Sequence, residues 1–238
     1  MGSGFLGQYW RVGGVCGILF LVLFIIGAII QGDEAPMFDD PVEEIRAYWV
    51  DEGNSYLLGD YFIGLGFILF YVPFLSALRS LLGAAEGGMQ MWSRVVFAGG
   101  ILMLALAAAA GASWTTLAWG DVAENASDET IQTLMWLDVG ATHFIPAGMA
   151  ILALPAALVI LRTKVLPIWL GGLTLIFGVL AVLSMLAILS DDPDDSFGWI
   201  SFPAMGIWIL VTSIVLVTKK DTSAAPTTAT GAPSAAVP

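Results

Sequence analysis

The chain has 238 residues, of which 58% are hydrophobic and only 12% are charged, whereas soluble domains average about 45–50% apolar and about 25% charged residues. This composition excludes an ordinary soluble globular protein. The net charge of −12 makes nucleic acid an improbable partner, because an acidic surface repels phosphates. The single cysteine, Cys16, excludes an intramolecular disulfide and a cysteine-based metal site.

Six uncharged stretches of 18 to 26 residues fill most of the chain, and a membrane-spanning helix needs about 20 such residues. The first stretch is too long for the apolar region of a cleaved signal peptide, so we expect it to be an uncleaved anchor. The predicted fold is therefore an all-α bundle of six transmembrane helices in one domain, residues 1–220. The expected spans are residues 12–31, 57–78, 95–119, 134–161, 166–189 and 197–218. Residues 221–238 lack periodicity, which predicts a disordered cytoplasmic tail.

The basic residues indicate an orientation. Seven of the eight lie at the N-terminus, in the second and fourth connections and at the C-terminus. Because Lys and Arg accumulate in cytoplasmic loops, both termini are expected to be cytoplasmic. Only Arg46 lies on the other side, where 16 of the 20 acidic residues occupy the first, third and fifth connections.

The first outer connection carries helix signals between residues 40 and 53. Asp40 is a good N-cap, Pro41 suits the first turn, Glu43 completes a capping box, and Gly53 is a natural stop. The apolar residues fall on one face at helical spacing: Val42, Ile45 and Trp49. We expect a short amphipathic helix that lies on the outer membrane surface or caps the bundle. The alternative is a solvated acidic loop.

The spans alternate in character. The outward-running ones begin with a tryptophan and a glycine pair: Trp10 with Gly13–Gly14, Trp92 with Gly99–Gly100, and Trp169 with Gly171–Gly172. The inward-running ones contain proline: Pro73, then Pro146 and Pro155, then Pro203. This alternation indicates three two-helix hairpins, which either descend from one unit or reflect how common Gly and Pro are in membrane helices. In both cases the glycines should allow close helix packing.

Three segments resemble a large group of uncharacterised bacterial integral membrane proteins, a domain of unknown function. They are residues 78–88 (LRSLLGAAEGG), 96–100 (VFAGG) and 161–171 (LRTKVLPIWLG). The resemblance covers roughly residues 10–218. It implies a six-span protein of the bacterial cytoplasmic (inner) membrane. Its motifs are structural, so it implies no catalytic or binding residue.

Three ionisable residues lie near the outer ends of spans: Asp60, Asp138 and His143. Such groups are costly within a membrane and by default suggest function. Thr142 shares a helix face with Asp138. A pair of His143 with Asp60 from another helix would form an acid–base or proton-coupled site. The alternative is structural: both acids begin helices, where a carboxylate complements the helix dipole, and His143 hydrogen-bonds a neighbouring helix.

The sequence offers no pattern for a catalytic, cofactor or metal site. One histidine excludes bis-histidine haem ligation. The motifs of serine hydrolases, zinc proteases and nucleotide-binding loops are missing, and the acidic run 191–195 lacks the spacing of a calcium site.

We therefore expect a non-enzymatic membrane scaffold or accessory protein whose partner is the lipid bilayer. The sequence defines neither a protein partner nor an oligomeric state. One alternative is a small-solute or proton-coupled transporter with a polar outer vestibule formed by Asp60, Thr115, Thr116, Asp138, Thr142 and His143. The other is an intramembrane enzyme that uses Asp60, Asp138 and His143.

Overall fold

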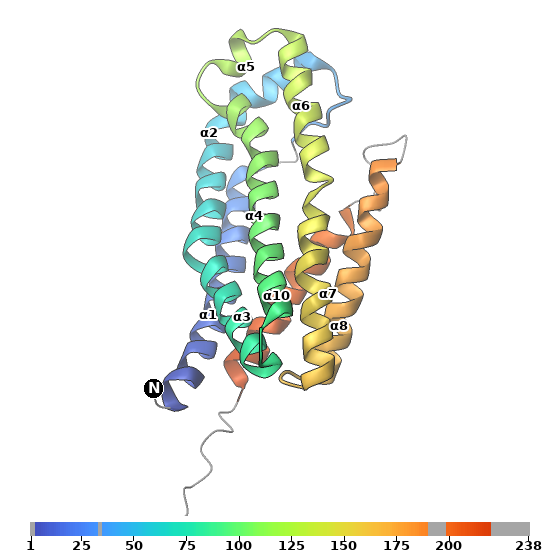
Figure 1. Ribbon diagram of the computed structural model, residues 1–238. Coiled ribbons are helices and arrows are strands. Elements are labelled where there is room, and N and C mark those ends of the chain that lie inside the picture. The colour runs from blue at the N-terminus through green and yellow to red at the C-terminus, as the bar shows by residue number, and fades with distance from the viewer. Residues whose placement is uncertain (1–2, 33–34, 190–198, 220–238) are drawn as a thin grey trace, which may run out of the picture.

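The computed structural model describes residues 3–32, 35–189 and 199–219. These residues form helices and connecting turns, and the long helices lie side by side in one elongated bundle (Figure 1). The α-helices are α1 (Ser3–Gln31), α2 (Val42–Gly66), α3 (Val72–Glu86), α4 (Met91–Ala118), α5 (Val122–Asn125), α6 (Asp128–Thr142), α7 (Ile145–Thr163), α8 (Ile168–Ser184) and α10 (Ser201–Thr218). A π-helix, η1 (Phe67–Tyr71), joins α2 to α3, and a 3-10 helix, η2 (Met185–Leu189), follows α8.

Six helical segments of the described part are long and apolar enough to cross a membrane. They are Tyr9–Gln31, Val42–Glu86, Met91–Ala118, Asp128–Thr163, Ile168–Leu189 and Ser201–Thr218. The predicted all-α fold with six transmembrane helices is confirmed. The expected tail, residues 221–238, and the acidic run 191–195 lie outside the described residues.

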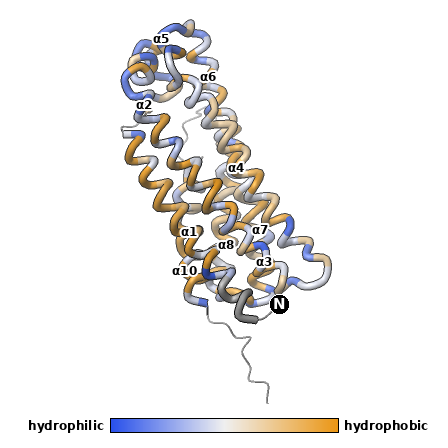
Figure 2. The backbone as a smooth tube through the Cα atoms, turned by 90° about the vertical axis from the view of Figure 1, so that its left-hand side faces the viewer, coloured by the Kyte–Doolittle hydropathy of each residue, from blue (hydrophilic) through white to orange (hydrophobic). Residues whose placement is uncertain are grey.

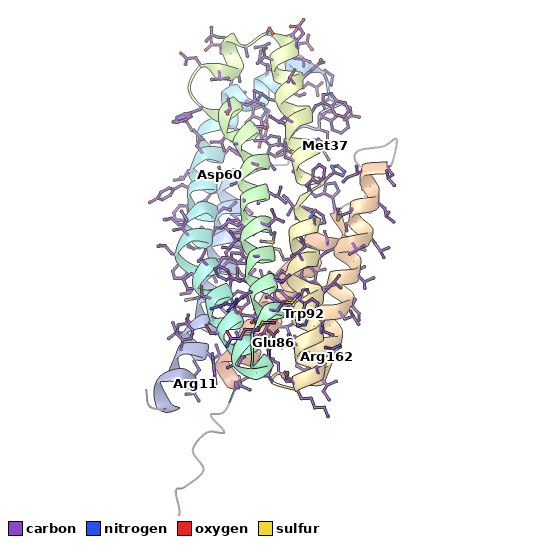
Figure 3. All side chains as sticks on the ribbon, in the orientation of Figure 1. Arg11, Met37, Asp60, Glu86, Trp92 and Arg162 are labelled. Atoms are coloured by element: carbon purple, nitrogen blue, oxygen red, sulfur yellow. The ribbon has the colours of Figure 1, made fainter. Side chains whose placement is uncertain are left out.

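The bundle has an apolar middle and two polar ends (Figure 2). At one end lie Arg11, Glu86, Trp92 and Arg162 (Figure 3). We call this end, where the N-terminus also lies, the basic end. The opposite end holds α5 and the adjoining ends of α2, α4 and α6, and we call it the head.

Glycines lie where the helices of the bundle approach one another most closely. A Cβ atom added to Gly99 of α4 would lie 2.4 Å from the backbone nitrogen of Leu152, and one added to Gly148 of α7 would lie 2.5 Å from that of Met103. Small residues permit such close approach. The resulting van der Waals packing holds membrane helices together, because the lipid gives no hydrophobic driving force for their association. Gly172, in contrast, faces open space, so not every glycine of the predicted pairs has a packing role.

Prolines interrupt two of the spans. Pro146 has no N–H to bond the carbonyl of Thr142, and α6 ends at that residue. His143 and Phe144 form a turn, and α7 begins with Pro146 in its first turn. In the second span, η1 ends at Tyr71, two residues before Pro73, and its wider helical turn accommodates a residue that lacks the donor.

The helix expected at residues 40–53 exists, but it is not a separate element. It begins at Val42 and continues through α2, η1 and α3 as one segment of 45 residues, about 67 Å long against a membrane core of about 30 Å. The predicted cap is wrong: Asp40 instead accepts a 2.7 Å hydrogen bond from the Met37 N–H. The predicted stop at Gly53 is also wrong. This glycine is buried, and a Cβ atom there would lie 2.8 Å from the carbonyl oxygen of Ala118.

Candidate functional site

The head has a hydrophobic core of its own, separate from that of the bundle. Its buried members come from α2, α4, α5 and α6: Ile45, Trp49, Tyr56, Leu117, Ala118, Ala123, Ile131 and Met135. Aromatic rings link the helices, since Trp49 packs edge-on against Tyr56 and Trp114 with ring centroids 5.0 and 5.6 Å away. The predicted apolar face of residues 42–49 is thus confirmed, and it packs against the other helix ends of the head.

Arg46 holds the connection between α4 and α6 against α2. Its guanidinium donates to the carbonyl oxygens of Ala123 and Glu124 and forms a 2.6 Å ion pair with Asp128. In the part of the chain that the structure describes, this is the only ion pair. The sequence predicted no contact for Arg46, which stood out there only as an exception to the charge bias. Its isolation among acidic residues was the available signal.

Asp60 and Thr115 meet where the head joins the bundle. We call this region, which also contains Tyr56 and Asp138, the junction. The Thr115 hydroxyl oxygen lies 2.9 Å from Oδ2 of Asp60 and 2.8 Å from the carbonyl oxygen of Gly111. Because the hydroxyl has one proton, it bonds one of these acceptors at a time, and the charged carboxylate is the stronger acceptor. This contact links α2 to α4.

Asp138 lies on the inside of α6 and is 9% exposed. It makes no hydrogen bond among the described residues, but Tyr56 lies within electrostatic range of both Asp138 and Asp60. Tyr56 is itself buried and precedes Asp60 by one helical turn. Both carboxylates therefore lie near Tyr56, for which the sequence predicted no role. The four-residue spacing of Tyr56 and Asp60 was the signal for it.

Neither acid begins a helix, so this part of the structural alternative is wrong. Asp60 lies in the interior of α2, which starts at Val42, and Asp138 lies in the interior of α6, which starts at Asp128. Their helix-dipole interaction is therefore weak, since the dipole acts within the first turn.

His143 turns back onto its own helix. Its Nδ1 atom lies 2.7 Å from the carbonyl oxygen of Val139, so the ring carries a proton on Nδ1 and donates it there. No hydrogen bond joins His143 to Asp60 or Asp138 in the described residues. Thr142 is half-buried, and Thr116 bonds the carbonyl of Ala112 in its own helix.

The described residues contain no group of three His, Cys, Asp or Glu side chains that could hold a metal ion. The junction therefore offers two carboxylates and a tyrosine, which can carry protons, and a threonine hydroxyl that is hydrogen-bonded to one of the carboxylates.

Comparisons with protein-family models, with curated proteins and with solved structures find no match to this chain. On the residues described above, the chain is a multi-pass membrane protein with an acidic helical head.

Proposed function

We propose that the chain is a non-enzymatic scaffold or accessory protein of the bacterial cytoplasmic membrane that presents its head on the extracytoplasmic side. The bacterial membrane follows from the resemblance of residues 78–88, 96–100 and 161–171 to bacterial proteins. The orientation follows from the basic end, which the bias of Lys and Arg assigns to the cytoplasm.

The observation that carries this proposal is the head itself. From Val42 to Asp60, α2 extends about 27 Å beyond the junction at 1.5 Å per residue. A separate hydrophobic core fixes the helix ends there, and Arg46 closes the connection on them. A protein that only needed to cross the membrane would have no use for such an extension. A rigid acidic surface outside the bilayer suits the binding of another protein.

The polar residues of the junction support a structural role. Thr115 bonds Asp60, Thr116 bonds its own helix, and His143 bonds Val139. Of these contacts, the one between Thr115 and Asp60 positions two helices relative to each other. An intramembrane enzyme receives less support, because no hydrogen bond among the described residues links Asp60, Asp138 and His143 to one another.

Site-specific cross-linking in native membranes tests the scaffold. A photoreactive residue replaces Val50, which is 53% exposed on the head, and the control replaces Ile68, which is 69% exposed in the apolar middle. The proposal predicts one defined protein adduct from position 50 and lipid adducts alone from position 68. The same adducts at both positions, or none at position 50, would contradict it.

A proton-coupled transporter is the second candidate, and the buried Asp138 is the observation that favours it. A carboxyl group with no hydrogen bond beside a buried tyrosine is a plausible proton carrier. Proteoliposomes that enclose a pH-sensitive dye distinguish the transporter from the scaffold. A proton leak above that of empty liposomes that Asp138→Asn abolishes would establish transport. A leak equal to that of empty liposomes favours the scaffold.

A further inference from the structure

A pocket opens at the basic end between α1, α3 and α4. Its volume of about 420 Å³ falls within the range of roughly 300–1,000 Å³ typical of small-molecule sites. It is lined by Tyr9, Ser76, Arg79, Ser80, Arg94 and Phe97.

A second pocket at the same end of the bundle has a volume of about 580 Å³ and includes Lys164 and Lys219 in its lining.

Two arginines from different helices face the first pocket without a counter-charge. Arg79 lies on α3 and Arg94 on α4, and neither has a hydrogen bond or an ion pair within the described part of the chain. None of the described residues that line the pocket carries a carboxylate. Glu86, the acid of the α3–α4 connection, instead accepts hydrogen bonds of 2.9 Å from the backbone N–H groups of Trp92 and Ser93. Two like charges beside one cavity favour an anion between them.

The donors for that anion are the guanidinium groups. Ser76 donates its proton to the carbonyl of Val72, and Ser80 donates to that of Ser76, so both hydroxyl protons are already used. A guanidinium presents paired N–H donors in a plane, a geometry that matches the oxygens of a phosphate group.

The position of the pocket indicates a lipid as the source of the phosphate. Arg79 precedes Glu86 by two helical turns, about 10 Å toward the apolar middle. Tyr9 and Phe97 supply aromatic walls, and Val12, one turn from Tyr9, is exposed on the apolar surface. A lipid can thus place its phosphate on the arginines while its chains remain in the bilayer.

We propose that Arg79 and Arg94 form a binding site for the phosphate group of an anionic phospholipid in the leaflet at the basic end. Basic pockets between membrane helices commonly hold anionic headgroups. The second pocket suits this role less well, because Lys219 donates a 2.7 Å hydrogen bond to the carbonyl of Val165 and is already engaged.

Native mass spectrometry of the purified full chain, titrated with phosphatidylglycerol, tests the proposal. Each arginine near the headgroup should contribute about fivefold in affinity, so Arg94→Gln weakens binding about fivefold and the Arg79→Gln/Arg94→Gln double variant roughly 25-fold. The matched control is Arg11→Gln/Arg162→Gln, which removes the same charge from the same end at residues that line neither pocket. It should bind as the unchanged protein does.

Two competitors are tested in addition. Inorganic phosphate and phosphatidylcholine, at matched concentrations, should not compete for the site. Equal loss of binding in the control variant would overturn the proposal, because it would indicate attraction by the overall charge. Effective competition by inorganic phosphate would overturn the lipid as the source. Arg94 is exposed, so Arg94→Gln keeps the test valid if the double variant does not fold.

Discussion

The Thr115 hydroxyl oxygen lies 2.9 Å from Oδ2 of Asp60, and this contact joins α4 to α2 where the bundle meets the head. Hydrogen bonds to charged groups contribute about 1.5–3 kcal/mol, more than neutral ones. One threonine therefore fixes how two membrane helices are rotated relative to each other.

Removal of this hydroxyl should destabilise the fold. Thr115→Val is expected to lower the free energy of unfolding by about 1.5–3 kcal/mol, because it leaves the carboxylate without its donor. The adjacent Thr116→Val is the matched control and should change it by less than about 0.5 kcal/mol, since Thr116 bonds only its own helix. Denaturation in mixed detergent micelles measures both. Equal effects of the two substitutions would refute the Asp60–Thr115 link.

Arg46 should matter more than its ion-pair partner. Arg46→Gln loses the bonds to two carbonyl oxygens as well as the ion pair, so we expect a loss of about 1–3 kcal/mol. Asp128→Asn removes only the ion pair with Arg46. Because the carboxylate of Asp128 is exposed, this substitution should lower the free energy of unfolding by less than about 1 kcal/mol. Hydrogen exchange of residues 120–127 should accelerate in Arg46→Gln alone. Similar exchange in both variants would show that the carbonyl contacts contribute little.

The close contact of α4 with α7 predicts a strong effect at Gly99. A Cβ atom there would lie 2.4 Å from a backbone nitrogen, so Gly99→Ala must push the helices apart and should cost about 1–3 kcal/mol. Gly172→Ala adds the same methyl group in open space and should be neutral or stabilising. Thermal unfolding of the two variants in one detergent provides the comparison. A stable Gly99→Ala protein would contradict the observed packing.

His143→Ala should leave a folded protein. The imidazole bonds a carbonyl oxygen of its own helix beside a turn that Pro146 already imposes, so its loss should cost about 0.5–1.5 kcal/mol. Size-exclusion chromatography and circular dichroism of the variant measure this. An aggregated or unfolded variant would show that His143 holds the turn between α6 and α7.

Several features of the fold follow from the sequence because they depend on local composition. In a membrane, the backbone N–H and C=O groups of a long uncharged stretch find hydrogen-bond partners within a helix, so such stretches predict helices. The spacing of Ile45 and Trp49 likewise predicts one apolar face, and both residues are buried. The continuity of α2 could not be predicted in the same way. Gly53 has the local signature of a helix end, and what keeps it helical is the backbone of Ala118 packed against it.

The site could be predicted only in part for a similar reason. Asp60 and Asp138 stand out in sequence because charge is rare near membrane spans. Their surroundings depend on how α2, α4 and α6 are rotated against one another. That rotation brings Thr115 to Asp60 and places Tyr56 near both acids, and it leaves His143 on its own helix. No spacing within one segment contains this information.

The central claim is that the head lies outside the membrane, on the side opposite the basic end, and cysteine accessibility in intact cells tests it most directly. In a Cys16→Ala background, Val50→Cys places a thiol on the exposed head, and Met89→Cys places one in the exposed turn between α3 and α4. A membrane-impermeant thiol reagent should label position 50 in intact cells and position 89 only after permeabilisation. Labelling of position 89 in intact cells with protection of position 50 would contradict the account.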